Sequence, residues 1–149
     1  MKNFFIIIVL FASAFIYGQQ KDAELSWETN FEKAKVKAKQ ENKPILVLFT
    51  GSDWCPPCKL LKKDFFNSPK FKAKSRDFVL LLVDFPRNKD LVSAQQATAN
   101  KKLNSEYEVR SLPTLIALDY KGNIIDKIKG YNAGRDTRYH YEFVDKVLD

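Results

Sequence analysis

The sequence is poor in the side chains that hold metals. Its 149 residues contain two cysteines, Cys55 and Cys58, and one histidine, His140. A structural zinc site normally needs four ligands, most often cysteine or histidine, and the chain lacks that number. We therefore expect no metal and no cofactor, and the cysteine pair must be explained in another way.

The chain also lacks an apolar run of the roughly 20 residues that a membrane-spanning helix needs. Its apolar stretch at residues 4–17 follows a short region, residues 1–3, that carries the basic Lys2. Small-residue cleavage sites occur at residues 12–14 and 17–19, and we favour cleavage after Gly18. This arrangement predicts a secretory signal peptide over residues 1–18, with an uncleaved anchor as the alternative. No cysteine lies near the cleavage region, which excludes a lipid attached there.

Export would place the protein in an oxidising compartment. We therefore expect it to be periplasmic or secreted, with no stable membrane association once the signal is removed. We interpret residues 19–26 as a polar lead-in. The remaining residues, 27–149, are enough for one domain with a hydrophobic core.

Acidic residues are outnumbered, 18 against 25 basic ones, which gives a formal charge of +7. Cleavage after Gly18 would remove one of the basic residues, Lys2. The lysines are spread over several predicted elements, and the arginine-rich run of many nucleic-acid-binding proteins is missing. We expect a solvated basic surface and no nucleic-acid partner.

The two cysteines stand two residues apart, between an apolar run at residues 45–49 and a helical pattern at residues 60–66. A strand that ends in a Cys-x-x-Cys loop and opens a helix is typical of a thiol–disulfide redox site. A small structural disulfide and half of a metal site are the alternatives. Because the ring closed by this pair is too small to constrain the unfolded chain much, the spacing favours chemistry.

A helix that begins near Cys55 points its unpaired N–H groups and its positive dipole end at that sulfur, which favours the nucleophilic thiolate. Pro56 and Pro57 bring no N–H groups of their own. We therefore expect a moderately lowered thiol pKa for Cys55. Cys58, one helical turn further on, lies within reach of a mixed disulfide formed at Cys55.

The rest of the pattern alternates helices with strands. We expect helices at residues 27–42, from Cys55 to about 66, 69–75, 90–107 and 136–148, and strands at residues 45–49, 78–85, 114–119 and 124–129. Residues 45–49 are apolar at consecutive positions, which predicts burial on both faces, as in a central parallel strand. Asn30 is a candidate helix cap, and Ser68 with Pro69 predicts a second helix start.

Two helices have predicted inward-facing positions. For residues 90–107 these are Leu91, Ala94, Thr98 and Leu103, and for residues 136–148 they are Tyr139, Phe143, Val144 and Val147. His140 is expected to be a surface or half-buried structural residue.

With the Trp54–Lys59 motif (Trp-Cys-Pro-Pro-Cys-Lys) and the later Leu112-Pro113-Thr114 placed, the chain resembles the thioredoxin superfamily over about residues 27–148. It is similar above all to exported thioredoxin-like proteins and to the C-terminal periplasmic domain of the membrane protein DsbD. The resemblance implies an α/β thioredoxin fold, a central mixed sheet flanked by helices on both faces.

The resemblance also implies roles. Cys55 would be the nucleophile, Cys58 the resolving thiol, and Pro113 a cis-proline facing them. From the residues alone, Leu112-Pro113 indicates only an extended or turn dipeptide. The implied substrate-binding residues are Trp54, Pro56, Pro57, Leu112, Pro113 and Gly130. For Trp54, ordinary packing is the alternative.

The chain departs from the family in one place. Thioredoxins commonly bury an acidic residue beneath the second cysteine, but Leu48 and Phe49, the candidate positions, are apolar, and Lys62 stands where the DsbD domain has an acid. No evident carboxylate therefore handles the Cys58 proton. Replacing a nearby negative charge by Lys62 should favour the thiolate.

Together these features predict an exported thiol–disulfide oxidoreductase that reduces protein disulfides. Its Pro-Pro dipeptide lacks the histidine of the strongly oxidising DsbA type, so we expect a reductant. A reductant needs electrons there, and the implied donor is a membrane thiol transporter of the DsbD kind. The alternative is a non-catalytic thioredoxin-fold module that binds peptides or thiols near Pro113; metal delivery lacks ligands.

Overall fold

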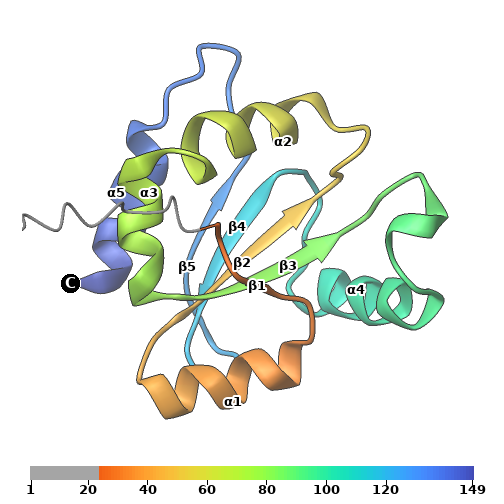
Figure 1. The fold of residues 1–149 in the computed structure, drawn as a ribbon, viewed down its shortest axis with the longest axis horizontal. Coiled ribbons are helices and arrows are strands. Elements are labelled where there is room, and N and C mark those ends of the chain that lie inside the picture. Colours follow the sequence, from red (N-terminus) through yellow and green to blue (C-terminus); the bar gives the residue numbers. More distant parts are fainter. Residues whose placement is uncertain (1–23) are drawn as a thin grey trace, which may run out of the picture.

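The computed structural model describes residues 24–149. The predicted signal peptide, its cleavage site and most of the lead-in lie outside this range. A five-stranded mixed sheet in the order β1-β3-β2-β4-β5 forms the centre of the molecule (Figure 1). Its strands are β1 (Trp27–Glu28), β2 (Ile45–Thr50), β3 (Val79–Asp84), β4 (Thr114–Leu118) and β5 (Ile124–Lys129).

The central strand is β2, and all six of its residues are buried. It runs parallel to β3 and antiparallel to β4, so both of its edges are hydrogen-bonded. The predicted burial on both faces is confirmed. The hairpin between β4 and β5 is confirmed as well, with antiparallel pairing from Thr114 opposite Lys129 onward.

The prediction of one helix from residue 27 to 42 was wrong at its start. Trp27 and Glu28 form β1 and pair in parallel with Leu80 and Leu81 of β3. Helix α1 spans Phe31–Glu41, because the Asn30 side chain accepts a hydrogen bond from the Lys33 N–H and caps it. Pairing with the sheet therefore prevails over the apolar periodicity of this stretch.

Helices cover both faces of the sheet, as the resemblance implied (Figure 1). One face packs against α1 and α4 (Ala94–Glu106). The other packs against α2 (Pro56–Leu61), the π-helical η1 (Lys62–Phe66), α3 (Pro69–Lys74) and α5 (Arg138–Leu148). Two short 3-10 turns, η2 (Ser75–Asp77) and η3 (Lys89–Leu91), complete the described elements.

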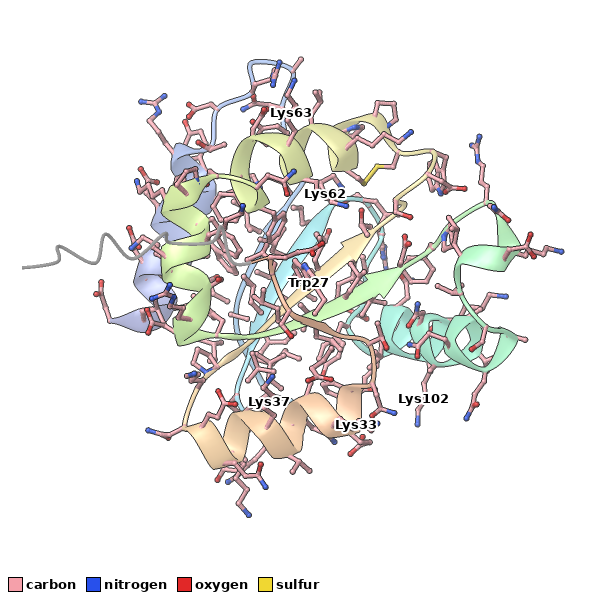
Figure 2. The ribbon with its side chains drawn as sticks, viewed as in Figure 1. Trp27, Lys33, Lys37, Lys62, Lys63 and Lys102 are labelled. Carbon is pink, nitrogen blue, oxygen red and sulfur yellow. A yellow bond between two sulfur atoms is a disulfide. The ribbon has the colours of Figure 1, made fainter. Side chains whose placement is uncertain are left out.

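Lysines occur on several of these helices. Figure 2 shows Lys33 and Lys37 on α1, Lys62 and Lys63 on η1, and Lys102 on α4. Most are exposed, so their charge is solvated. No helix within residues 24–149 has the length and apolar character that crossing a bilayer requires.

Helix α4 begins later than predicted, with Ser93 as its N-cap; the Ser93 side chain accepts from the Gln96 N–H. Of its four predicted inward positions only Leu103 is buried; Leu91, Ala94 and Thr98 are exposed. The second buried residue is Asn100, whose side chain donates to the Asp84 carbonyl at 2.8 Å. A buried amide that satisfies a strand end leaves no apolar signal in the sequence.

Helix α5 presents His140, Phe143 and Val144 to the core. Tyr139, predicted to face inward, is 56% exposed, because it lies at the edge of the face that these i, i+3 and i+4 positions form. The expectation for His140 was also wrong: its side chain is buried, between the rings of Phe65 and Tyr131.

Candidate active site

The cysteine pair lies where the central strand passes into a helix. Cys55 is the N-cap of α2, its N–H donates to the Gly51 carbonyl at 3.0 Å, and its carbonyl accepts from the Lys59 N–H at 3.1 Å. Pro56 and Pro57 take the first two helical positions. Helix α2 continues directly into η1, so the predicted helix up to Phe66 is present, with a π-helical second half.

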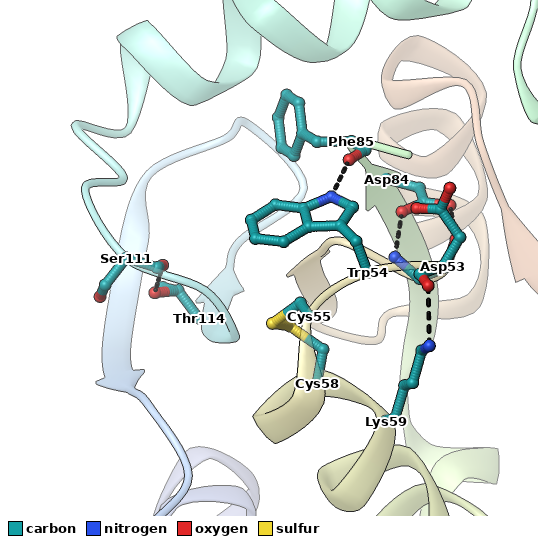
Figure 3. The surroundings of a disulfide bond; sticks show 10 residues. Asp53, Trp54, Cys55, Cys58, Lys59, Asp84, Phe85, Ser111 and Thr114 are labelled. Carbon is teal, nitrogen blue, oxygen red and sulfur yellow. Dashed lines mark hydrogen bonds between the residues drawn. A yellow bond between two sulfur atoms is a disulfide. The ribbon is translucent and has the colours of Figure 1, made fainter. Parts of the chain in front are cut away.

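Cys55 and Cys58 form a disulfide, with 5.3 Å between their Cα atoms. Both residues are nearly buried, 3% and 4% exposed. The bonded sulfurs lie at the start of a helix and offer an attacking thiolate a small exposed edge. That edge lies between Trp54 and the turn that carries Ser111 and Thr114 (Figure 3).

Contacts with the loop after β3 fix Trp54 at one side of the exposed disulfide edge, and we call this boundary the active-site rim. Its indole N–H donates to the Phe85 carbonyl at 2.8 Å, and the Arg87 guanidinium lies 4.8 Å from the centre of its ring. Gly51 makes room for it, because a Cβ there would lie 2.6 Å from the Trp54 ring. The indole nevertheless remains 37% exposed, so it presents an aromatic face beside the disulfide. Phe85 and Arg87 carried no signal in the sequence.

Asp53 ties this loop to the one after β3. Its carboxylate accepts from the Arg87 N–H and from the Asn88 N–H, the latter at 2.8 Å. The Asn88 N–H is the main cause that lowers the pKa of Asp53. Lys59 donates to the Asp53 carbonyl at 2.7 Å, which fixes the first turn of α2 against the loop (Figure 3).

Opposite the cysteines, the Leu112–Pro113 peptide bond is cis, as the resemblance implied. The Thr114 hydroxyl donates to the Ser111 carbonyl at 2.7 Å, and the Gly130 N–H donates to the Pro113 carbonyl, also at 2.7 Å. Gly130 has a φ of +77°, which suits a residue without a side chain. Within residues 24–149, no hydrogen bond engages the backbone of Leu112. An extended segment could therefore pair with it.

A cavity of about 280 Å³ lies on the other side of Cys58. Leu48 lines it, which confirms that an apolar side chain occupies the position beneath the second cysteine. Lys62 lines it too, together with the hydroxyl-bearing Thr50 and Ser52. The sequence reasoning missed one acid here, Glu24, which borders the same cavity from the lead-in. The cavity has room for water beside Cys58.

The segment after Gly130 is fixed to η1 by charge. Asp64 accepts from the Tyr131 hydroxyl at 2.9 Å and from Nε of Arg135 at 2.8 Å, and the second guanidinium nitrogen bonds its other oxygen. Arg135 lowers the pKa of Asp64 to about 2. Burial, aided by Asp64, raises the pKa of Tyr131 to about 12.

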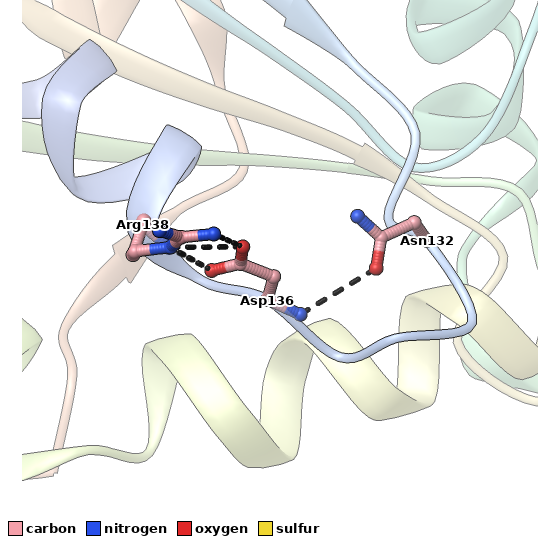
Figure 4. Close-up of polar contacts among 3 residues, drawn as sticks. All are labelled: Asn132, Asp136 and Arg138. Carbon is pink, nitrogen blue, oxygen red and sulfur yellow. Dashed lines mark hydrogen bonds and ion pairs between the residues drawn. The ribbon is translucent and has the colours of Figure 1, made fainter.

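Contacts within the segment from Asn132 to Arg138 stabilise the loop that precedes α5. Arg138 pairs with the Asp136 carboxylate, with 2.6 Å between Nη2 and Oδ2, and the Asp136 N–H donates to the Asn132 side chain at 3.5 Å (Figure 4). The Arg138 side chain lowers the pKa of Asp136 to about 2. These contacts order the loop that leads from Gly130 back to the core.

Metal-binding side chains do not gather in the described part of the chain: residues 24–149 hold no group of three or more histidine, cysteine or acidic side chains suited to an ion. The cysteine pair lies beside the Trp54 ring and a cavity whose lining includes Leu48, Thr50 and Lys62. Such surroundings suit thiol–disulfide exchange.

A Cys-x-x-Cys disulfide at the start of a helix, across from a cis-proline and beside the central strand of a mixed sheet, defines the class of thioredoxin-fold thiol–disulfide oxidoreductases. Residues 31–144 match the profile of the thioredoxin-like domain family, and the chain belongs to that family.

Known proteins agree with this class. The chain is 32% identical over 118 residues to the disulfide bond reductase DsbH of Chlamydia pneumoniae, an alignment that covers 78% of this chain and 69% of DsbH. It is 34% identical over 96 residues to the thiol:disulfide interchange protein DsbD of Vibrio vulnificus, covering 62% of this chain but only 14% of DsbD. A solved structure of a DsbH oxidoreductase superposes with a TM-score of 0.75 at 29% identity, covering 85% of this chain and 86% of that one.

Proposed function

We propose that this oxidoreductase is exported and reduces disulfides of other proteins, with Cys55 as the nucleophile and Cys58 as the resolving thiol. The observation that carries the proposal is the position of Cys55 at the start of α2, next to the rim formed by Trp54 and the turn before Thr114. Cys58 lies within the first turn of the helix and lines the cavity on its other side.

The reaction begins with the reduced pair. The Cys55 thiolate attacks one sulfur of a substrate disulfide, a mixed disulfide forms, and the other substrate sulfur leaves as a thiolate that takes a proton from water. Cys58 then loses its proton and attacks the Cys55 sulfur. The second substrate sulfur leaves, the substrate has gained two electrons, and the protein holds the Cys55–Cys58 disulfide. The cavity beside Cys58 supports water as the first acceptor of its proton.

Substrate docking would use the rim on both sides of the disulfide. The proposed substrate-binding residues are Trp54, Pro56, Pro57, Leu112, Pro113 and Gly130. The unpaired backbone of Leu112 supports this, since an extended segment gains main-chain hydrogen bonds by pairing with such an edge. Gly130 would contribute indirectly, because its N–H donates a hydrogen bond to the Pro113 carbonyl and so positions Pro113.

Each cycle needs two electrons from outside. An exported reductant meets an oxidising compartment, so a membrane dithiol donor of the DsbD type is the partner that we propose. The similarity to DsbH supports disulfide reduction as the direction of the reaction, and the similarity to DsbD supports a donor of that type. The reduction potential of the couple tests the direction: a value near about −270 mV fits a reductant of the thioredoxin kind, and one near about −120 mV fits an oxidant of the DsbA kind.

The activity itself is tested by insulin reduction with dithiothreitol as the electron source. We expect the wild-type protein to accelerate precipitation of the insulin B chain, and Cys55→Ser to behave like dithiothreitol alone. A folded wild-type protein that does not exceed the dithiothreitol background would overturn the proposal. The same assay distinguishes the proposal from the second candidate, a module that only binds peptides or thiols through the groove near Pro113. Such a module would not accelerate insulin reduction above the dithiothreitol background.

A further inference from the structure

A groove of about 590 Å³ runs from the active-site rim toward α4. Trp54 and Leu112 line its end beside the disulfide, and Phe85 and Val109 add apolar surface. Its polar lining comes from Asn104, Ser105 and Ser111, and its charged lining from Lys101 and Arg110. Among the residues that the structure describes, every ionised side chain that lines the groove is therefore cationic.

A third cation stands at the same rim. The Arg87 guanidinium lies 4.8 Å from the centre of the Trp54 ring, and its side chain is exposed. The acid next to Trp54, Asp53, has its carboxylate occupied by the N–H groups of Arg87 and Asn88. The Asp53 carboxylate therefore accepts its hydrogen bonds from the loop after β3.

Two acids near α4 are not among the residues that line this groove. Glu106 lines a separate hollow with Glu32 and Lys35, between α1 and α4. Glu108, two residues before Arg110, lies outside the lining of the groove. No carboxylate among the described residues that line the groove therefore neutralises its positive charge.

We propose that this groove selects protein disulfides whose flanking residues are acidic, with Lys101 and Arg110 as the specificity-determining residues. The inference rests on the proposed function, because it assumes that substrates reach Cys55 along the Trp54–Leu112 rim. Cationic groups that line a cleft raise the encounter rate and complementarity of an anionic partner, and the effect fades with salt. A peptide with carboxylates beside its disulfide fits this apolar floor and cationic wall.

The test uses three peptides that share one disulfide and differ only in flanking residues: glutamate, serine or lysine. The reduced protein is mixed with an excess of each peptide, and the second-order rate constant for this single round of disulfide reduction is measured at low and high salt. We expect the glutamate peptide to exceed the lysine peptide by about tenfold at low salt, with the ratio falling toward one at high salt.

Two variants localise the effect. Charge reversal by Lys101→Glu with Arg110→Glu should invert the order of the peptides. The matched control, Lys33→Gln with Lys39→Gln, removes two exposed charges from α1 and should keep the glutamate preference. Circular dichroism checks that each variant is folded.

Equal rates for the three peptides, or the same loss of preference in the α1 control, would overturn the selectivity while leaving disulfide reduction in place. Failure to reduce any of the peptides, serine included, would overturn the proposed function and the selectivity with it.

Discussion

At the scale of single residues, the reactivity of Cys55 depends on how few donors surround it. As N-cap of α2 it faces a helix start whose first two residues are prolines, so the Cys58 N–H and the helix dipole are left to stabilise the thiolate. Lys62, in the next turn, adds positive charge near the pair.

We therefore predict a Cys55 thiol pKa below the free value of about 8.5, in the upper part of the range of roughly 3.5–7.5 found at helix starts. The measurement is the pH dependence of iodoacetamide alkylation in Cys58→Ser. Lys62→Glu in that background should move the midpoint upward, because a negative charge disfavours the thiolate. An unchanged midpoint in Lys62→Glu would remove Lys62 from this explanation.

His140 has an environment that penalises its charged form. Neither ring nitrogen has a hydrogen-bond partner among the described residues. Burial lowers its pKa below the ordinary 6.5 and outweighs the opposing effect of the Gly130 backbone, which does not have the geometry of a hydrogen bond to the ring. The folded state thus binds fewer protons than the unfolded state once the pH falls below about 6.5.

The consequence is a loss of stability on acidification. The contribution of neutral His140 is fully present above about pH 6.5 and declines as the pH falls toward the lower pKa of the folded state. We predict that His140→Leu flattens the free energy of unfolding between about pH 7 and 5, as measured by urea titration. A slope as steep as that of the wild-type protein would contradict this.

At the scale of elements, η1 joins the active-site helix to the rest of the fold through aromatic packing. Phe65 is fully buried and its ring contacts those of Phe66, Phe71 and Tyr141. Removing it leaves a cavity in the core beneath η1. We predict that Phe65→Ala lowers the free energy of unfolding by about 3–5 kcal/mol. Leu148→Ala, at a partly exposed position in the last turn of α5, should cost far less in the same urea titration.

The Asp64–Arg135 pair fastens the loop after β5 to the same element. Because the pKa of Asp64 lies at about 2 in the folded state against an ordinary 3.8, its contribution is present above about pH 3.8 and is lost as the pH falls toward 2. We predict that Asp64→Asn lowers stability at neutral pH and weakens the pH dependence of unfolding between about pH 4 and 2.

The control for this prediction is Asp90→Asn, which alters an exposed carboxylate in η3. It should leave the acid limb of the stability curve close to that of the wild-type protein. If Asp64→Asn and Asp90→Asn gave the same curve, the pair with Arg135 would have no part in acid stability.

At the scale of the whole molecule, the alternation of helices and strands and the position of the cysteine pair could be predicted from local sequence signals, whereas the thioredoxin fold was expected from the family resemblance. Consecutive apolar residues place β2 at the centre of the sheet, and Asn30 and Ser68 cap their helices through their own side chains. Such signals need no knowledge of distant segments.

What the sequence did not reveal depends on contacts between distant segments. Trp27 has a helical pattern but pairs with β3, and Asn100 is polar but buried against the end of that strand. His140 is buried because η1 and the loop after β5 close over it. Arg87 follows β3, Arg110 precedes β4, and both lie near Trp54, which follows β2, only in the folded protein. The cationic groove could therefore not be predicted from the sequence.

The central claim, that Cys55 attacks and Cys58 resolves, is tested most directly by trapping. Reduced Cys58→Ser and Cys55→Ser are each mixed with the same peptide disulfide, and the mixed disulfides are followed and mapped by mass spectrometry. The account predicts a rapid, lasting adduct on Cys55 in the first variant and a much slower one on Cys58 in the second, because Cys55 stands at the N-terminus of α2 and Cys58 lies within the helix. Equal rates, or a faster adduct on Cys58, would contradict it.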